Sequence, residues 1–339
     1  MSKQFDTVVF IGRFQPVHNA HIEIIKNAFT YADEVVVIIG SANQPRTYKN
    51  PFSADERHQM IQESMREHIP SGAKFRIEHN HDTIYNDQAW AIRIQEKVGR
   101  FEQKVAIIGH DKDDSTYYLK MFPQWHLIDV PLIEPLHSTE IRDIYFKEPN
   151  NMNFIKHVVP NYAYKFLVNF CDTYQFKQIV KEREFIATYK KQYESLAYPP
   201  VFVTADAVVI QSGHILMIKR RSEPGKGLWA LPGGFLNANT DKSVKDAAVR
   251  ELKEETGIKV PTPVLYGSIH DEKVFDAISR SARGRTITHA FKFVLPDGPL
   301  PKVKGMDDAE KASWIPIGEL DSSTCFEDHY ELITHFIGA

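Results

Sequence analysis

The stretch that decides the fold of the first half of the chain is FIGRFQPVHNAH, residues 10–21. An apolar run over residues 7–11 predicts a buried strand that ends at Gly12, and a run with helical spacing begins at His21. Residues 12–20 are therefore expected to form a strand-to-helix turn at the carboxyl edge of a parallel sheet, where ligands bind in open α/β folds.

The residues of this turn suit a phosphate group. Gly12 lets a ligand approach the backbone, and Arg13 adds a fixed positive charge. His18 and His21 are three residues apart, so they share one face at a helix start, together with free N–H groups and the positive end of the helix dipole. The turn predicts a site for phosphate oxygens. Two histidines that only cap a helix would explain the pair alone equally well.

The alternation of strands and helices extends this prediction along the first half. Strands are expected at residues 7–11, 35–39, 75–78, 105–108 and 126–130, and helices at residues 21–31, 54–67, 88–98 and 115–121. Such alternation predicts a doubly wound parallel sheet, an α/β fold.

Polar residues follow the later strands of this predicted sheet. Tyr85 and Asn86 precede Trp90, whose ring either packs in the core or stacks on a flat cationic ring. The fourth strand ends at Gly109, and the polar cluster after it, which includes Asp111, is typical of an active-site edge.

A second candidate phosphate site begins at Ser138. The hydroxyls of Ser138 and Thr139, the helix N–H groups and Arg142 together can hold a polyphosphate. A plain capped helix is the other interpretation of the same residues, and it stays open at this point.

Residues 12–21 resemble the GRFQPxHxGH signature of the HxGH nucleotidyltransferases, with Ala20 in place of the usual glycine. Residues 138–142, STEIR, resemble the second signature of that family. The combination over residues 5–150 resembles the archaeal-type nicotinamide mononucleotide (NMN) adenylyltransferases. The resemblance implies that Trp90 packs on the nicotinamide ring near Tyr85 and Asn86. The other ATP or NMN contacts that we expect are Gly12, Arg13, Phe14, Gly109, Asp111, Ser138 and Thr139.

The implied reaction needs no side-chain nucleophile, because the 5′-phosphate of NMN is itself the anion that attacks the α-phosphorus of ATP. Positioning and neutralisation of charge then carry the catalysis. We expect His18, His21 and Arg142 to be catalytic, with Mg²⁺ on the triphosphate of the co-substrate ATP.

The second half has a different pattern. Strands are expected at residues 201–210, 214–220, 264–270 and 286–295, with one long helix at residues 243–256. This mixture predicts an α+β domain with a mixed sheet. We expect a first domain at residues 1–185, a connector at 186–200 that ends at a Pro-Pro pair, and a second domain at 201–339.

The sharpest motif of the chain is RELKEETGI, residues 250–258, downstream of LPGGF, residues 231–235. Glu251, Glu254 and Glu255 share one helix face, where three like charges repel each other unless Mg²⁺ or Mn²⁺ binds them. A solvated acidic helix face is the plainer interpretation. The Pro-Gly-Gly turn before the helix and the Gly257 helix stop favour the metal site.

This motif resembles a Nudix box, and the resemblance covers residues 200–339. It implies hydrolysis of a nucleoside diphosphate linked to another group, by attack of metal-bound water on phosphorus with Glu255 among the catalytic residues. One place departs from the box, because Lys242 stands where a glutamate normally pairs with the arginine, and the loop from Gly234 is two residues longer. Arg250 must find another acid, for which Asp241 is the candidate.

The region around the box resembles Nudix domains that act on ADP-ribose. We expect Arg220, Gly234, Phe275, Arg283 and Arg285 to contact that substrate, although the arginine-rich loop could equally be a solvated basic loop. Glu310, in an acidic loop, is the candidate for a base near the metals.

The order of the two halves resembles bifunctional enzymes of NAD metabolism, with NAD made from NMN and ATP, and ADP-ribose cleaved to AMP and ribose 5-phosphate. Two other readings stay open: a Nudix half that senses ADP-ribose without cleaving it, and a first half that adenylylates another acceptor. Mg²⁺, or Mn²⁺, is expected at both sites.

The bulk properties agree with an enzyme that acts on small molecules. A net charge of −3 gives no general attraction to nucleic acid or membrane. Two distant cysteines, no signal peptide and no apolar run near the ~18 residues of a membrane span predict a cytoplasmic protein, and leave a homo-oligomer open.

Overall fold

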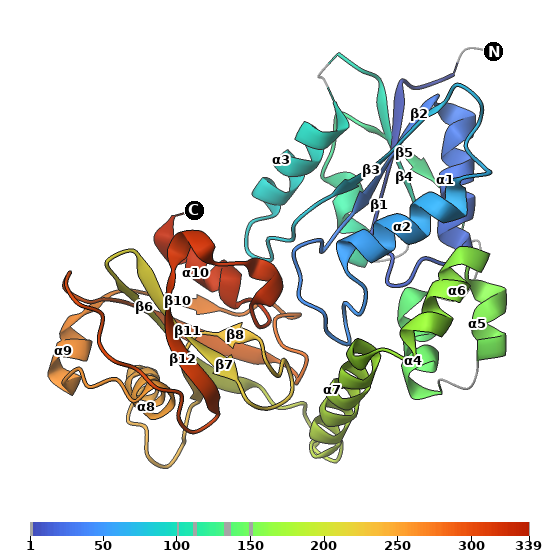
Figure 1. Ribbon diagram of the computed structural model, residues 1–339. Helices are drawn as coiled ribbons and strands as arrows, with labels where there is room; N and C mark the ends of the chain where they lie inside the picture. Colours follow the sequence, from blue (N-terminus) through green and yellow to red (C-terminus); the bar gives the residue numbers. More distant parts are fainter. Residues whose placement is uncertain (1–2, 100–101, 111–113, 132–136, 149–151, 339) are drawn as a thin grey trace. The chain divides into compact units, whose positions relative to one another are not determined.

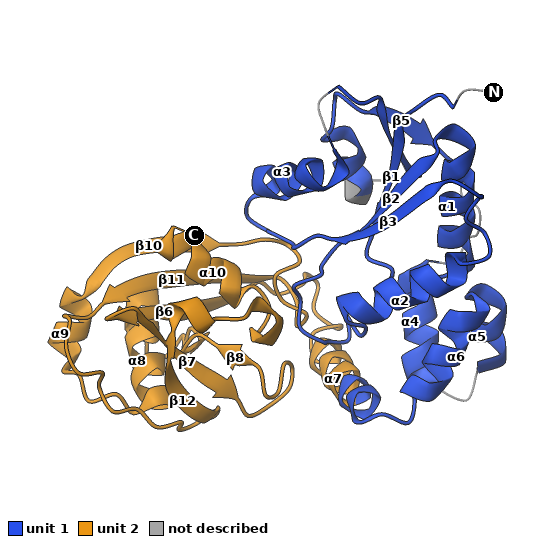
Figure 2. Ribbon diagram, turned by 45° about the horizontal axis from the view of Figure 1, so that its top comes forward, with its two compact units in different colours: residues 1–180 blue, residues 181–339 orange. Residues whose placement is uncertain are grey.

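The computed structural model describes residues 3–99, 102–110, 114–131, 137–148 and 152–338. The chain divides into two compact units, residues 1–180 and 181–339 (Figure 2). Among the described helices, none combines the length and the apolar character that a membrane crossing requires.

A sheet of five parallel strands forms the centre of the first unit, in the order β3-β2-β1-β4-β5. Its strands are β1 (Thr7–Gly12), β2 (Glu34–Ile39), β3 (Lys74–His79), β4 (Val105–Gly109) and β5 (His126–Asp129) (Figure 1). The helical elements are α1 (Asn19–Tyr31), α2 (Ala54–Met65), α3 (Asp87–Val98), the 3-10 helix η1 (Asp114–Lys120), α4 (Ser138–Lys147), α5 (Met152–Val158) and α6 (Asn161–Phe170). The predicted doubly wound sheet is confirmed.

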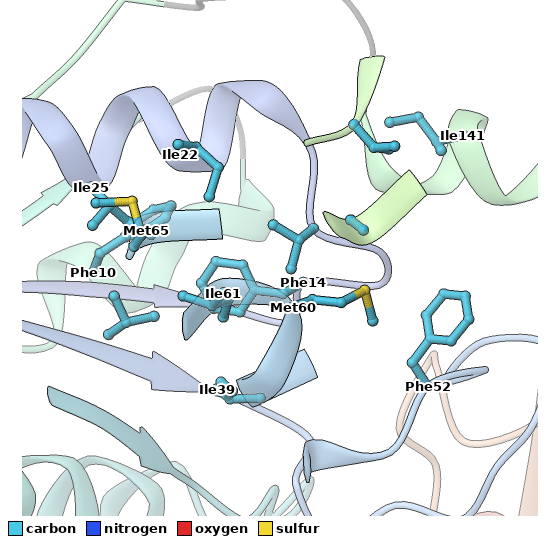
Figure 3. Packing of buried hydrophobic residues seen from close by; sticks show 14 of the residues in the cluster. Phe10, Phe14, Ile22, Ile25, Ile39, Phe52, Met60, Ile61, Met65 and Ile141 are labelled. Carbon is cyan, nitrogen blue, oxygen red and sulfur yellow. The ribbon is translucent and has the colours of Figure 1, made fainter. Parts of the chain in front are cut away.

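Both faces of the central strands β1, β2 and β4 are buried, because both sets of alternating side chains are apolar there. On β1, Val8 and Phe10 enter one core with side chains of α1, α2 and α4–α6, part of which Figure 3 shows. Val9 and Ile11 enter a second core with α3 and η1. A parallel strand covered on both faces reads as a continuous apolar run, which is why residues 7–11 do so.

The strand order places the candidate site. The chain runs outward from β1 through β2 and β3 on one side, and through β4 and β5 on the other. The carboxyl ends of β1 and β4 therefore border the switch point of the sheet, where open α/β folds bind ligands.

The second unit is built on a sheet of seven strands in the order β10-β11-β6-β7-β12, with β8 paired to β7 and β9 paired to β6. Its strands are β6 (Phe202–Gln211), β7 (His214–Arg220), β8 (Trp229–Ala230), β9 (Gly233–Phe235), β10 (Ile269–Phe275), β11 (Thr286–Val294) and β12 (Ala309–Pro316). The pair β6–β11 is parallel and the other pairs are antiparallel, so the predicted mixed sheet is confirmed.

Helix α8 (Val244–Thr256) packs on this sheet through Ala247, Ala248 and Leu252. Ser243 caps its start, and Gly257 ends it with φ +59°. The other helical elements are α9 (Thr262–Gly267), the 3-10 helices η2 (Ile317–Glu319) and η3 (Ser322–Thr324), and α10 (His329–Ile337).

The predicted strand at residues 264–270 is wrong over most of its length. Pro261 and Pro263 start the short helix α9 instead, because proline is favoured in a first helical turn. Strand β10 begins only at Ile269. Strand β12 had no counterpart in the sequence analysis.

Helix α7 (Tyr174–Lys191) contains the division between the two units. Its residues from Lys181 onward belong to the second unit (Figure 2), so the predicted connector at 186–200 begins inside a helix.

Candidate active sites

In the first unit, His18 and His21 stand at the start of α1 with their rings stacked, centroids 3.6 Å apart. The backbone N–H of His18 donates to Nδ1 of His21 over 3.2 Å. Burial and the neighbouring His137 lower the pKa of His18 to about 4, and burial with His18 nearby lowers that of His21 well below its usual range. Both rings are therefore neutral at physiological pH and can act as hydrogen-bond donors.

Nδ1 of His18 is buried at the cap of α1, on the side of the ring that faces the backbone of His21. A neutral imidazole whose Nδ1 faces a backbone N–H carries its own donor on Nε2.

Two arginines lie near this histidine pair. Arg142 is 5% exposed, and its Nη1 and Nη2 donate to Gln15 O over 2.7 Å and to Thr139 Oγ1 over 3.2 Å. Burial and the nearby charge of Arg13 lower the pKa of Arg142 to about 10, so the group remains charged. Arg13 itself is exposed at the end of β1.

Arg142 thus does more than the sequence analysis expected, because it also holds the turn after β1. The side-chain amide of Gln15 is bonded in turn to both backbone groups of Phe52, and Ser138 Oγ donates to Pro16 O. The helix cap of α4 is His137, with Ser138 and Thr139 in the first turn rather than at the cap.

Sequence reasoning assigned no role to Arg57. This residue is 1% exposed and forms hydrogen bonds with the backbone at the ends of β1 and β2. Its Nη1 donates to the carbonyls of Arg13 and Gly40 over 2.7 Å each, and its Nη2 donates to Ser41 O over 3.1 Å. The position of Arg57 in α2 gave no signal, because only the fold shows which carbonyls its guanidinium meets.

The residues expected around the nicotinamide ring lie at the start of α3. Asn86 caps the helix through its side chain, which accepts from Ala89 N over 3.0 Å, and Tyr85 is half-buried. Trp90 is also half-buried and packs against Tyr118 and Phe122, centroids 6.2 Å away in each case. Trp90 is thus partly a core residue and partly open.

Gly109 and Phe14, expected to contact nucleotide, are both buried. A Cβ at Gly12 would meet the Phe14 ring at 2.9 Å, so the turn needs a glycine there. Asp111, the remaining predicted contact, lies outside the described residues.

In the second unit, one cavity of about 600 Å³ gathers the residues of the Nudix-like motif. Its acidic lining consists of Asp206, Glu223, Glu251, Glu254, Glu255, Asp307, Asp308 and Glu327, and its arginines are Arg220, Arg250, Arg280 and Arg283. The structure therefore brings together Arg220, Gly234, Arg283 and the three predicted metal ligands.

Glu255 is the most buried of the three motif carboxylates, with 4% exposure. Its Oε2 accepts from Gly233 N over 2.9 Å. Burial, reinforced by Glu251, raises the pKa of Glu255 to about 8, and burial also raises the pKa of Glu251. A Cβ at Gly234 would collide with the carboxylate of Glu251, so the Gly-Gly turn must come this close to the acids.

Arg250 organises the outer side of this acidic cluster. It donates to both oxygens of Asp241 over 2.9 Å, and its Nη1 donates to Glu251 and Glu254 over 2.8 Å each. The prediction that Asp241 replaces the missing glutamate of the box is confirmed. These hydrogen bonds, first those to Asp241, raise the pKa of Arg250 above its usual range.

The donor set fits a hard divalent cation, since carboxylate oxygens are the ligands that Mg²⁺ and Mn²⁺ prefer. Burial raises the pKa values of two of the three acids, Glu251 and Glu255. A bound cation would lower these pKa values again. The part of the chain that the structure describes contains no cluster of three such groups already converged on one point. Glu251 and Glu254 would have to turn from Arg250 to reach a shared ion.

Three predicted residues lie outside the cavity lining. Phe275 is fully buried against Phe336, on the inward side of β10. Arg285 donates to Asp276 O, and Glu310 is exposed at an irregularity between β12 and β7. Asp307 and Asp308, just before Glu310, line the cavity instead.

Sequence reasoning also missed two cavity residues at the start of α10, Glu327 and His329. Arg280 donates to both carboxylate oxygens of buried Asp328 over 2.9 and 3.0 Å. Nδ1 of His329 accepts from Leu231 N over 2.9 Å, and burial lowers the pKa of His329 to about 3. The run Glu327-Asp328-His329 before a helix was the available signal.

Comparison with known proteins also finds two different families in the two halves of the chain. The profile of the Cytidylyltransferase-like family matches residues 9–144, and that of the NUDIX domain matches residues 201–336. The nicotinamide/nicotinic acid mononucleotide adenylyltransferase of Acinetobacter baylyi is 36% identical over 180 residues, which cover 52% of this chain and 92% of that protein. The ADP-ribose pyrophosphatase of Methanocaldococcus jannaschii is 33% identical over 161 residues, 48% of this chain and 83% of that protein.

Solved structures extend the likeness over both units. The crystal structure of a bifunctional NMN adenylyltransferase/ADP ribose pyrophosphatase from Francisella tularensis superposes with a TM-score of 0.90 at 36% identity, covering 98% of this chain and 99% of that one. A second structure of the Francisella tularensis enzyme, complexed with AMP and a Mn ion, gives a TM-score of 0.87 at 35% identity, with 98% and 99% covered. The chain belongs to the family of bifunctional NMN adenylyltransferase/ADP-ribose pyrophosphatases.

Proposed function

We propose that this chain is a bifunctional enzyme of NAD metabolism whose two activities lie in its two compact units. Residues 1–180 transfer the adenylyl group of ATP to NMN, and residues 181–339 hydrolyse ADP-ribose to AMP and ribose 5-phosphate. The observation that carries this assignment is that each unit holds its own set of groups for a phosphoanhydride, one of neutral imidazoles and arginines, the other of buried carboxylates.

In the first unit, His18, His21 and Arg142 bind the phosphates of ATP, with Arg13 at the rim. The low pKa of His18 and the stacking of its ring on His21 support this role, because they place two neutral imidazoles at the start of a helix. A neutral imidazole donates a hydrogen bond without a proton transfer, so the site can stabilise charge as it develops on the leaving pyrophosphate. Arg57 keeps the ends of β1 and β2 in place, which makes it a positioning residue.

The NMN acceptor lies beside Trp90, with Tyr85 and Asn86 near its pyridine ring. The half-open Trp90 supports this, because a cationic ring stacks well on an indole face. We further propose that the triphosphate arrives with Mg²⁺ bound.

In the second unit, Glu251, Glu254 and Glu255 hold the divalent metal ions. Such ions supply an activated water and stabilise the charge that develops on the diphosphate. Arg250 keeps the helix face in place through Asp241, which lets Glu251 and Glu254 turn without loss of the arginine. Arg220 and Arg283 lie in the same cavity and neutralise the diphosphate, and Gly234 admits it close to the backbone.

The test is product analysis with the full chain. With ATP and NMN, NAD and pyrophosphate should form. With ADP-ribose and Mg²⁺ or Mn²⁺, AMP and ribose 5-phosphate should form, and excess EDTA should stop this second reaction. Preference for another phosphorylated acceptor over NMN would overturn the first assignment. ADP-ribose that binds but stays uncleaved with either metal would overturn the second.

A further inference from the structure

The cavity of the second unit has a wall that lies outside the NUDIX-matched region. The match begins at residue 201, whereas Phe185 and Tyr189, on α7, line the cavity together with the motif carboxylates. Both residues belong to the second compact unit. A segment that precedes the catalytic domain in the sequence therefore completes its substrate cavity.

Phe185 and Tyr189 are one helical turn apart, and their aromatic rings lie close together at the cavity wall. Their ring centroids are 6.2 Å apart at an interplanar angle of 26°. The Tyr189 ring also contacts Phe202 at 5.9 Å, and Phe202 contacts Phe235 at 5.7 Å. Phe185 is 38% exposed, so part of its face is open to a ligand.

A buried acid fixes the helix that carries these rings. Glu182 occupies the buried stripe of α7 next to Ile179 and Ile186, at a position where the pattern expects an apolar residue. Its Oε1 accepts from Gly225 N over 3.2 Å, which ties α7 to the loop before β8. Burial raises the pKa of Glu182 to about 7.

The other aromatic rings of the cavity are already engaged by cations. Arg220 stands over the Phe326 ring at 4.0 Å, and Arg283 stands over the Phe235 ring at 4.9 Å. In the described part of the chain, no cation covers Phe185 or Tyr189 in this way. Of the two groups attached to the diphosphate of ADP-ribose, only the adenosine has a flat π face, which stacks on aromatic side chains.

We propose that Phe185 and Tyr189 form the platform on which the adenine base of ADP-ribose stacks, and so determine specificity for a nucleoside diphosphate. The inference rests on the proposed hydrolysis of ADP-ribose by this unit. It gives α7 a binding role in addition to its place in the sequence, where it connects the two domains.

The experiment measures steady-state hydrolysis by the full chain of ADP-ribose and of a diphosphate that carries ribose at both ends and no base. The wild-type KM for the base-free compound should exceed that for ADP-ribose by about 10-fold or more. Phe185→Leu and Tyr189→Leu should each raise the KM for ADP-ribose by about 10-fold with kcat within about twofold, and leave the KM for the base-free compound unchanged. Tyr189→Phe should behave as the wild type.

Tyr174→Leu is the matched control, because Tyr174 is 71% exposed on the same helix and does not line the cavity. Adenylyl transfer and thermal unfolding of each variant report on folding. Equal wild-type KM values for the two substrates would overturn the proposal without any variant. An equal rise for both substrates in the leucine variants would overturn it too. Wild-type enzyme that cleaves neither substrate would refute the hydrolytic function itself.

Discussion

Replacing Glu255 by glutamine should stabilise the metal-free second unit while abolishing hydrolysis. The carboxyl of Glu255 is 4% exposed, and burial raises its pKa from the ordinary 4.5 to about 8. Between these two pH values the unfolded chain loses the proton that the folded chain keeps, so the free energy of unfolding falls as pH rises from 4.5 to 8. Glutamine has no such titration, and its Oε1 can still accept from Gly233 N.

The size of the effect follows from the same two pKa values. Each tenfold change in an ionisation constant corresponds to 1.36 kcal/mol. The difference between the two pKa values therefore limits the gain in the free energy of unfolding from Glu255→Gln to about 5 kcal/mol at pH 8. Below pH 4.5 this gain falls to nearly zero. If the free energy of unfolding increases by half of this upper limit, the Tm of a domain of this size should rise by roughly 5–10 °C.

Calorimetry of the full chain in EDTA at pH 5 and pH 8 measures this gain. The transition of the second unit is identified as the one that Mn²⁺ shifts in the wild type, by about 2.7 kcal/mol at 100 times the Kd. Glu255→Gln should raise this transition at pH 8 far more than at pH 5, and should lose most of the Mn²⁺ response. Glu319→Gln, at an exposed position outside the cavity, is the control and should change neither. A variant that is destabilised at pH 8, or that still responds fully to Mn²⁺, would refute the reasoning.

Four further predictions concern the other contacts. His18→Ala should lower kcat for NAD formation by about 100-fold with little change in KM, since it removes a donor to developing charge, and near-normal turnover would contradict this. Because burial and His137 lower the pKa of His18 to about 4, the wild-type kcat should show no titration of this ring between pH 6 and 7; a step there that disappears in His18→Ala would count against it. Trp90→Ala should raise the KM for NMN by about 10-fold and spare that for ATP. The product NAD is reduced enzymatically and measured as NADH fluorescence, and equal effects on both substrates would assign Trp90 to the core alone. Asp241→Asn should weaken the bidentate pair with Arg250, lower the Tm of the second unit by a few degrees and slow hydrolysis of ADP-ribose. An unchanged Tm and an unchanged rate would show that Arg250 needs no partner at this position.

The parallel sheet was predictable because buried parallel strands read as apolar runs between amphipathic helices. The acidic face of α8 followed from spacing along one helix. The Arg250–Asp241 pair followed from the resemblance to the Nudix box, which implies an acidic partner for this arginine.

The errors lie where tertiary structure decides the outcome. Residues 264–267 are apolar enough for a strand, but the prolines that precede and begin this stretch favour a helix instead. Phe275 lies beside the arginine-rich loop in sequence, yet the period of β10 turns its side chain into the core. Glu310 lies at an irregularity in the pairing of β12 with β7, so Asp307 and Asp308 reach the cavity instead.

Arg57, Glu182, Phe185 and Tyr189 act through partners far away in the sequence. Arg57 meets carbonyls at the ends of β1 and β2. Glu182 accepts from the backbone of Gly225, and Phe185 and Tyr189 line the cavity of the following domain. No local pattern identifies such partners, which become visible only when the fold places them together.

The most direct test of two independent phosphoanhydride sites is to assay His18→Ala and Glu255→Gln for both reactions. The account predicts that His18→Ala loses NAD formation and keeps wild-type hydrolysis of ADP-ribose, and that Glu255→Gln shows the reverse. Loss of both activities in either folded variant, or full hydrolysis by Glu255→Gln, would contradict it.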